Sequence, residues 1–270
     1  MAPCLDDVAN RATRGEEQFF DASTIYRPRP RTSPDLRLIC FPYAGAGAAV
    51  YRLWPNYLSE DIEVVAVHPP GRAHRLRERP LTRIEAMVEG AIASLTPLMD
   101  RPFAVFGHSL GAVVAAEFVR SLHERGRTAA HLFVSARPPR LEPTRLLHRL
   151  PDQEFVEAIN RKYNGIPAEI LTEPELLELL LPALRADIEA LETFRPHLDR
   201  PKIACPTTVY GGTHDRNVSE PDLAGWDGET TKPCRIRVFP GDHFYINANA
   251  AAVLADLSMT LSSQLMTVRE

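Results

Sequence analysis

Residues 103–112 read Phe-Ala-Val-Phe-Gly-His-Ser-Leu-Gly-Ala: a short apolar run, a Gly-x-Ser-x-Gly turn and the start of a segment rich in Ala and Val. The pattern predicts a buried strand, a sharp turn and a helix. Gly107 and Gly111 allow the backbone to bend and neighbouring elements to approach closely. Ser109 would then stand above the sheet edge at a helix N-terminus, the position of a nucleophilic serine. A serine in an ordinary tight turn is the alternative interpretation.

Further apolar runs, separated by turn signals, are typical of short buried strands. They span residues 36–41, 62–67, 131–135, 207–210 and 235–239. Segments with helical periodicity, 81–99 and 110–124, lie between some of them. The alternation predicts an α/β fold with a mostly parallel central sheet flanked by helices. In such sheets the functional sites collect at the carboxyl ends of the strands.

The composition is that of an enzyme-sized globular chain, with 270 residues, 44% hydrophobic and 24% charged. A formal charge of -4 gives no general attraction to nucleic acid or to an anionic membrane surface. No apolar run approaches the roughly 18 residues of a membrane span, and the N-terminal segment lacks the apolar core of a signal peptide. The four scattered cysteines are expected to be reduced thiols. We therefore expect a cytoplasmic protein with no nucleic-acid or membrane partner.

We divide the chain into a lead-in and one domain. Residues 1–35 are expected to be a polar tail, because the Arg-Pro repeats near its end favour extended, solvated backbone. Residues 36–270 form the α/β domain. Within it, about 141–201 interrupts the strand-helix alternation, is rich in leucine and carries prolines at 143, 151, 167, 174, 182 and 196. We interpret this interval as an inserted lid of several short helices. Ordinary helix packing is the alternative.

A nucleophilic serine requires a base within hydrogen-bond reach and a group that orients the base. In folds that carry a nucleophilic serine on such a turn, the acid and then the histidine follow on later loops. Only His243 lies beyond the last expected strand, and Asp215 lies on the loop after the preceding one. Asp199, Asp222, Asp227 and Asp242 are less well placed, and His108 is expected to point away from Ser109. A metal site of His214, Asp215, Asp242 and His243 is the less favoured alternative, so we expect no metal.

Hydrolysis of an acyl group also requires donors for the oxyanion. The backbone N–H of Leu110, directly after the nucleophile, is one candidate. The second is expected from the loop after the first strand, residues 41–47, and we name the N–H of Ala44. The same loop lacks the endings of a phosphate-binding loop and of a dinucleotide fingerprint.

Taken together, these segments resemble the type II thioesterases that accompany polyketide synthases and nonribosomal peptide synthetases. The resemblance runs from about Tyr26 to Leu261 and is carried by the turn around Ser109 and by blocks at 40–45, 70–72, 181–187 and 241–244. Two positions depart from the family's pattern: Ala46 stands where a second Gly is common, and Leu110 where Met is frequent. Neither change removes a backbone donor.

The resemblance implies an α/β-hydrolase fold, a Ser109-His243-Asp215 triad and an oxyanion hole of Ala44 and Leu110. The implied activity is hydrolysis of aberrant or stalled acyl groups from the phosphopantetheine thiol of acyl or peptidyl carrier proteins. No cofactor of the chain's own is implied. We also expect Tyr43, Leu177 and Leu180 to contact the substrate. Arginines near strand ends and in the lid could meet the phosphate or an acidic carrier, although solvated surface arginines are the commoner case: Arg72, Arg75, Arg77, Arg79, Arg137, Arg140, Arg145 and Arg149.

Two other functions remain open at this point. The fold and triad do not determine the leaving group, so a general carboxylesterase or lipase acting on oxygen esters is one. The other is a catalytically weak scaffold that binds carriers, against which the intact set of Ser109, Asp215 and His243 argues.

Overall fold

The computed structural model describes residues 24–140, 145–166, 168–197 and 199–269. Its centre is a seven-stranded sheet with the strand order β1-β3-β2-β4-β5-β6-β7. The strands are β1 (Ile25–Tyr26), β2 (Leu36–Phe41), β3 (Ile62–Val67), β4 (Phe103–His108), β5 (His131–Ser135), β6 (Thr207–Gly212) and β7 (Cys234–Phe239). Only β1 is antiparallel to its neighbour, and the other adjacent pairs are parallel.

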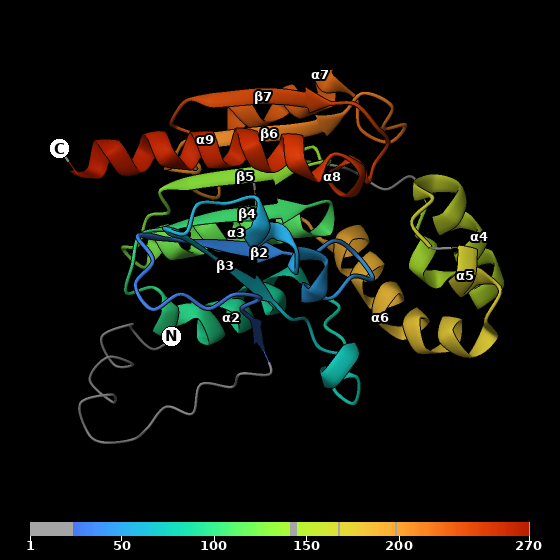
Figure 1. The fold of residues 1–270 in the computed structure, drawn as a ribbon. Helices are drawn as coiled ribbons and strands as arrows, with labels where there is room; N and C mark the ends of the chain where they lie inside the picture. The colour runs from blue at the N-terminus through green and yellow to red at the C-terminus, as the bar shows by residue number, and fades with distance from the viewer. Residues whose placement is uncertain (1–23, 141–144, 167, 198, 270) are drawn as a thin grey trace.

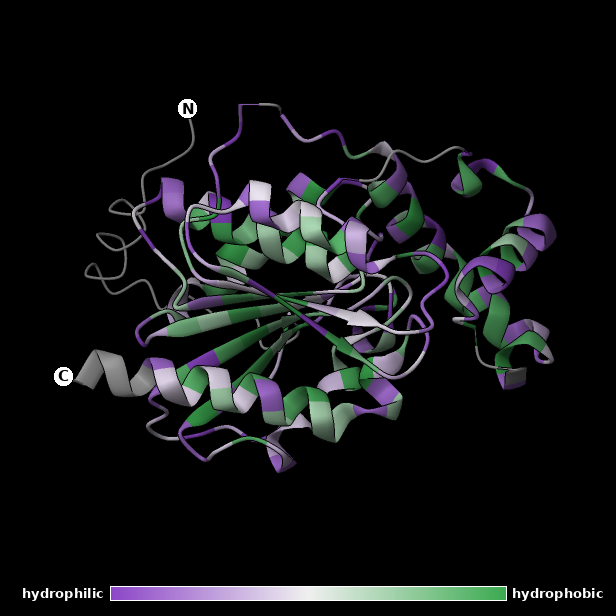
Figure 2. Cartoon of the chain, turned by 90° about the horizontal axis from the view of Figure 1, so that it is seen from above, coloured by the Kyte–Doolittle hydropathy of each residue, from purple (hydrophilic) through white to green (hydrophobic). Residues whose placement is uncertain are grey.

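Helices cover both faces of this sheet, as Figures 1 and 2 show. On one face, α2 (Ile84–Leu95) and α3 (Leu110–Glu124) bury their apolar sides in one core cluster. On the other, α9 (Ala250–Arg269) packs in a second cluster with the short helices η1 (Ala48–Tyr51) and η2 (Trp54–Asn56). Because both faces are covered, β2, β4 and β5 are buried along their whole lengths, which explains their uninterrupted apolar sequence.

The sequence-based strands agree with this sheet to within two residues at each end. Two expectations along the first half were wrong. The packed domain does not begin at residue 36, because Ile25 and Tyr26 form β1, which pairs with Val67 and Ala66 of β3. Ile25 is only 7% exposed and belongs to the core. Residues 1–23 of the expected tail lie outside the described residues. The first helix is shorter than expected, since α2 ends at Leu95 and a 3-10 turn containing Pro97 follows.

The interval expected to be a lid holds η5 (Leu147–Arg149), α4 (Asp152–Tyr163), α5 (Ala168–Leu171) and α6 (Pro174–Thr193). These helices share an apolar cluster that includes Phe155, Ile159, Ile166, Leu184 and Ile188. In Figure 1 they lie beyond the end of the sheet to which the strand arrows point. We call residues 145–197, apart from residue 167, the lid segment. It stands over the sheet edge where the site is expected.

The lid segment is not divided into short helices throughout. Pro151 and Pro174 stand at helix starts, where a missing N–H costs nothing. Pro182, however, lies inside the 20-residue helix α6. The helix continues past it because Ala183, Leu184 and Asp187, directly after the proline, are buried and anchor that half by tertiary contacts. Pro143 and Pro167, two of the six prolines in the interval, lie outside the described residues.

The C-terminal third supplies the loops that close the site. Short helices α7 (Glu220–Ala224) and η6 (Gly225–Glu229) join β6 to β7, and α8 (Tyr245–Ala248) follows β7. None of the helices in the described part of the chain combines the length and hydrophobicity of a membrane span.

Candidate active site

The turn between β4 and α3 holds Ser109 in a conformation that its glycines make possible. Ser109 has a φ of 54°, in the left-handed region. A Cβ at Gly107 would lie 2.0 Å from the carbonyl oxygen of Gly111, and one at Gly111 would lie 2.1 Å from that of Phe41. No side chain fits at either position, so the close approach of α3 to β2 and β4 depends on both glycines. A strained serine at such a turn is the geometry of a nucleophile elbow.

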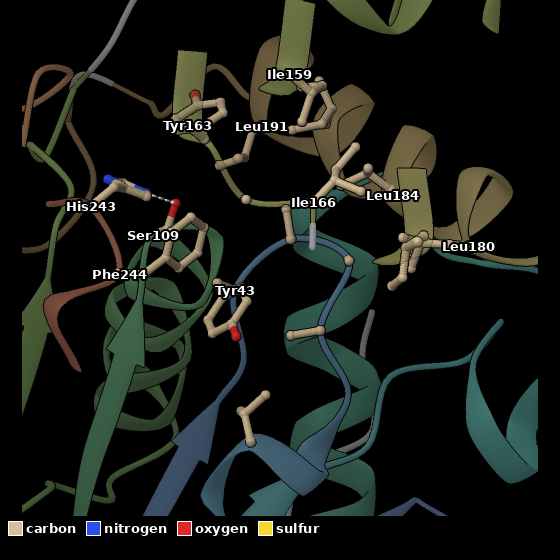
Figure 3. A pocket seen from close by; sticks show the side chains of 17 residues that line it. Tyr43, Ser109, Ile159, Tyr163, Ile166, Leu180, Leu184, Leu191, His243 and Phe244 are labelled. Atoms are coloured by element: carbon tan, nitrogen blue, oxygen red, sulfur yellow. Dashed lines mark hydrogen bonds between the residues drawn. The ribbon is translucent and has the colours of Figure 1, made fainter. Parts of the chain in front are cut away.

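His243 lies between Ser109 and Asp215. Its Nε2 is 3.0 Å from the Oγ of Ser109, and its Nδ1 is 2.7 Å from Oδ2 of Asp215. The other carboxylate oxygen of Asp215 accepts a hydrogen bond of 2.9 Å from the N–H of Asn217. Ser109 is 7% exposed and His243 4% exposed. The loops after β4, β6 and β7 thus bring the three residues named from the sequence together (Figure 3 shows the Ser109-His243 bond).

The other aspartates considered for the acid are engaged elsewhere or exposed. The carboxylate of Asp222 caps α7 through Ser219, and Oδ1 of Asp242 accepts from the N–H of Phe244. Asp199 and Asp227 are exposed. Asp215 is therefore the carboxylate that orients His243 in this structure.

His108 sits behind the triad rather than facing the nucleophile. Its Nδ1 is 2.8 Å from the Oγ of Ser135 on β5, and its ring centroid is 5.4 Å from that of His243. Burial, reinforced by the nearby His243, holds the pKa of His108 well below its ordinary value. The ring is therefore neutral at physiological pH and contributes no charge beside the base.

The loop after β2 forms a tight turn beside Ser109. The N–H of Ala46 donates to the carbonyl of Tyr43 at 3.0 Å, and Gly45 has a φ of 77°. Such a turn favours glycine at its third position. Among the described residues, no hydrogen bond engages the N–H of Ala44 or of Leu110. Both groups are thus available as the two donors of an oxyanion hole.

A cavity of about 220 Å³ opens over Ser109 and His243. Its floor includes Tyr43 and Phe244, and its roof comes from the lid segment (Figure 3). The roof is apolar and is formed by Ile159, Ile166, Ile170, Leu180, Leu184, Ile188 and Leu191. A second cavity of about 140 Å³, which Tyr43 also lines, is bordered by Leu110 and Arg72 among others. An apolar chamber next to a nucleophile suits an acyl chain.

Of the three substrate-contact residues expected from the sequence, Tyr43 and Leu180 line the main cavity. Leu177 is not among the residues that line this cavity, and it packs against the apolar cluster that the lid helices share. Sequence reasoning missed Tyr163 and Asp187. The position of Asp187 could have indicated its role. A buried carboxylate requires a partner, and this one is surrounded on α6 by buried apolar residues: Ala183, Leu184, Ile188 and Leu191.

The arginines considered for anion binding fall into three groups: ion-paired, buried and exposed. Arg72 pairs with Asp187, Arg75 with Glu78, Arg140 with Glu229, and Arg145 with Glu154. Arg137 is buried at 8% exposure under the lid segment, and its burial lowers its pKa. Arg77, Arg79 and Arg149 are exposed. The ion pairs explain four of these eight side chains without a ligand.

The described residues give no support to the alternative of a metal site. Asp215 and His243 bond to each other, while Nδ1 of His214 lies 3.0 Å from the hydroxyl of Thr213. Within the described ranges, no three His, Cys, Asp or Glu side chains come together as metal ligands.

A serine raised on a strand-to-helix elbow at the carboxyl edge of a mostly parallel sheet defines the class: the chain is a serine hydrolase of the α/β-hydrolase fold. More particularly, it belongs to the thioesterase domain family, whose model matches residues 36–261. It is an enzyme acting on thioesters.

The relatives and solved structures agree with this family. The gramicidin S biosynthesis protein GrsT of Aneurinibacillus migulanus is 36% identical over 214 residues, covering 78% of this chain and 83% of the relative. The thioesterase PikA5 of Streptomyces venezuelae is 36% identical over 237 residues, covering 87% and 84%. The solved structure of the type II thioesterase BorB, from the borrelidin biosynthetic cluster, superposes with a TM-score of 0.80 at 32% identity, covering 90% of this chain and 98% of that one.

Proposed function

We propose that this chain is a type II, editing thioesterase. It hydrolyses aberrant or stalled acyl groups from the phosphopantetheine thiol of acyl or peptidyl carrier proteins in polyketide or nonribosomal peptide biosynthesis. The observation that carries the proposal is the Ser109-His243-Asp215 set at the floor of an apolar cavity. The likeness to a gramicidin S biosynthesis protein and to a type II thioesterase of the borrelidin biosynthetic cluster supports it. The proposal places the enzyme in the cytoplasm, beside its carriers.

The chemistry proceeds in two acyl transfers. His243 accepts the proton of Ser109 as the Oγ attacks the thioester carbonyl, and the Ala44 and Leu110 N–H groups stabilise the oxyanion. The C–S bond then breaks, and the carrier thiolate takes the proton from His243. Water next attacks the acyl-serine with His243 as base, which releases the acid and restores Ser109. Nucleophile, base and donors all come from the chain, so these steps balance without a cofactor.

Thioesters match these groups well. A thiolate leaves with less need of protonation than an amine, so attack by serine and stabilisation of the oxyanion dominate the barrier. The apolar roof then contributes by holding the acyl group, while Asp215 keeps the tautomer and orientation of His243 that the attack requires.

Matched esters separate this function from a general esterase. Propionyl and octanoyl groups on N-acetylcysteamine are compared with the same groups on N-acetylethanolamine, which presents an oxygen leaving group. We expect kcat/KM to favour the thioester by more than the ratio of the two uncatalysed hydrolysis rates, and Ser109→Ala to abolish both activities. A preference for the oxygen esters would identify a carboxylesterase instead.

A further inference from the structure

An ion pair joins the lid segment to the body of the protein next to the oxyanion loop. Asp187 lies on α6, and Arg72 lies in the loop after β3, 115 residues away in sequence. Nη1 of Arg72 is 2.8 Å from Oδ2 of Asp187, and Nη2 is 3.0 Å from Oδ1. Asp187 is 1% exposed and Arg72 is 8% exposed. The pair is therefore a buried, two-bond contact between a guanidinium and a carboxylate.

Both members of the pair also bond to the backbone of the oxyanion loop. Oδ2 of Asp187 accepts from the N–H of Gly45 at 2.8 Å, and Nη1 of Arg72 donates to the carbonyl of Ala46 at 2.9 Å. The side chain of Leu184, one turn before Asp187 on α6, packs against Gly45, since a Cβ there would lie 3.1 Å from its Cδ1. The turn that carries Ala44 is thus held by Arg72 and by one turn of the lid helix α6.

The bond from Gly45 fixes a peptide orientation that the turn alone leaves free. Tight turns of this kind exist in two forms that differ by a flip of the central peptide, here the one between Ala44 and Gly45. Asp187 accepts the N–H of that peptide and so selects one form. A flip would turn the carbonyl oxygen of Ala44 toward the place where the Gly45 N–H now points, against the carboxylate of Asp187, so the peptide next to the Ala44 N–H keeps its present orientation.

Stability does not by itself account for such a pair. Two charges removed from water lose hydration, and well-packed apolar replacements of buried ion pairs are often equally stable or more stable. The remaining hydrogen bonds of this pair go to one loop, so the pair fixes the geometry of that loop instead. Donors of an oxyanion hole act through such fixed geometry, because they must be aligned before charge develops on the substrate.

We propose that Arg72 and Asp187 are positioning residues, which hold the Tyr43–Ala46 turn so that the Ala44 N–H faces the oxyanion and which couple the lid helix α6 to that turn. The proposal rests on the proposed function. The proposal distinguishes two halves of α6. The half after Pro182 is bonded to the catalytic loop through Asp187. The half before Pro182 does not contain Asp187, and its Leu176 and Leu179 are 50% and 52% exposed.

The pair has a kinetic signature distinct from that of the acyl-binding roof. Every substrate forms the same oxyanion, so loss of the pair lowers kcat by the same factor for propionyl and octanoyl thioesters and leaves KM nearly unchanged. Loss of one oxyanion donor costs on the order of 100- to 1,000-fold in kcat, and a misaligned donor costs part of that. We expect about 10- to 100-fold for Asp187→Ala.

The experiment measures kcat per active site, with Ser109 titrated to completion by a fluorophosphonate probe so that unfolded molecules do not count. At each position the Ala variant is compared with a milder one. Asp187→Ala is compared with Asp187→Asn, which keeps an acceptor for the Gly45 N–H. Arg72→Ala is compared with Arg72→Lys. Asn at 187 should recover most of the loss that Ala causes. The double Ala variant should lose no more than the worse single variant, since the two residues act as one unit.

Glu63→Gln is the matched control. Glu63 is a fully buried carboxylate at the amino end of β3, paired with Arg27 and Arg37 and away from the site. Its replacement should lower the melting temperature without changing kcat per titrated site. Equal kcat per site in wild type and Asp187→Ala would overturn the proposal, as would a loss confined to octanoyl substrates. Because each variant is scored against wild type on the same ester, failure of the proposed thioester preference would appear separately, in the wild type.

Discussion

The ring of Tyr163, the last residue of α4, lies 5.1 Å from the ring of His243, centroid to centroid, at an interplanar angle of 46°. The lid segment thus touches the proposed base directly. Phe244 contacts the other side, with its ring centroid 5.2 Å from that of His243. His243 is held between an aromatic residue of the lid and its own neighbour, which limits its water contact. Movement of α4 would change the solvent exposure of the base.

The first prediction concerns the nucleophile. Ser109→Ala should abolish turnover of acyl thioesters, because the attacking oxygen is lost. The fold should persist, since Ala fits wherever the Ser backbone and Cβ fit. Steady-state hydrolysis and thermal unfolding measure the two effects. Retention of more than a few per cent of the activity would exclude Ser109 as nucleophile.

The second prediction concerns the acid. Asp215→Asn should lower kcat greatly by misorienting His243; the effect is about 10⁴-fold in the protease case where it has been measured. Asp222→Asn is the control, because that carboxylate caps α7 and should affect stability alone. If Asp222→Asn proved the crippling change and Asp215→Asn did not, the assignment of the acid would be wrong.

The third prediction concerns the roof of the cavity. Leu180→Asn should raise KM for octanoyl thioesters more than for propionyl ones, because a longer chain loses more apolar contact. Leu179→Asn, one residue earlier and 52% exposed, should have little effect on either. Parallel kinetics on the two thioesters measure the difference. Proportional loss on both substrates, with earlier melting of the Leu180 variant, would show that Leu180 serves only the core.

The fourth prediction concerns pH and stability. Burial, with a smaller contribution from Arg235, lowers the pKa of His131 to about 4, whereas an unfolded histidine has a pKa of about 6.5. Above about pH 6.5 both states are neutral and the stabilisation is fully present. As the pH falls from about 6.5 toward 4, only the unfolded state takes up the proton, and the free energy of unfolding decreases.

Urea unfolding at pH 7.5 and pH 5 measures this decrease. His131→Gln should show a smaller drop between the two pH values than wild type, and the exposed His123→Gln should keep the wild-type drop. An identical drop in wild type and His131→Gln would mean that His131 does not stay neutral in the folded protein.

The sequence predicted the parts of the fold that local patterns encode. The apolar runs and the glycines around Ser109 specify strands and an elbow, and chain order then selects Asp215 and His243. It could not predict β1, whose two residues show no periodicity and are held by β3. Nor could it predict the unbroken α6, because burial after Pro182 overrides the local cost of the proline. The Arg72-Asp187 contact joins distant segments and depends on tertiary packing alone.

The most direct measurement of the central claim uses carrier proteins loaded with defined acyl groups on their phosphopantetheine arms. Intact-protein mass spectrometry follows each carrier after incubation with this chain or with its Ser109→Ala variant. We expect the wild type to convert acyl-carrier into the free-thiol carrier, by the mass of the acyl group less one hydrogen, and the variant to leave it loaded. Loaded carriers that persist with the wild type while free oxygen esters are hydrolysed would contradict the account.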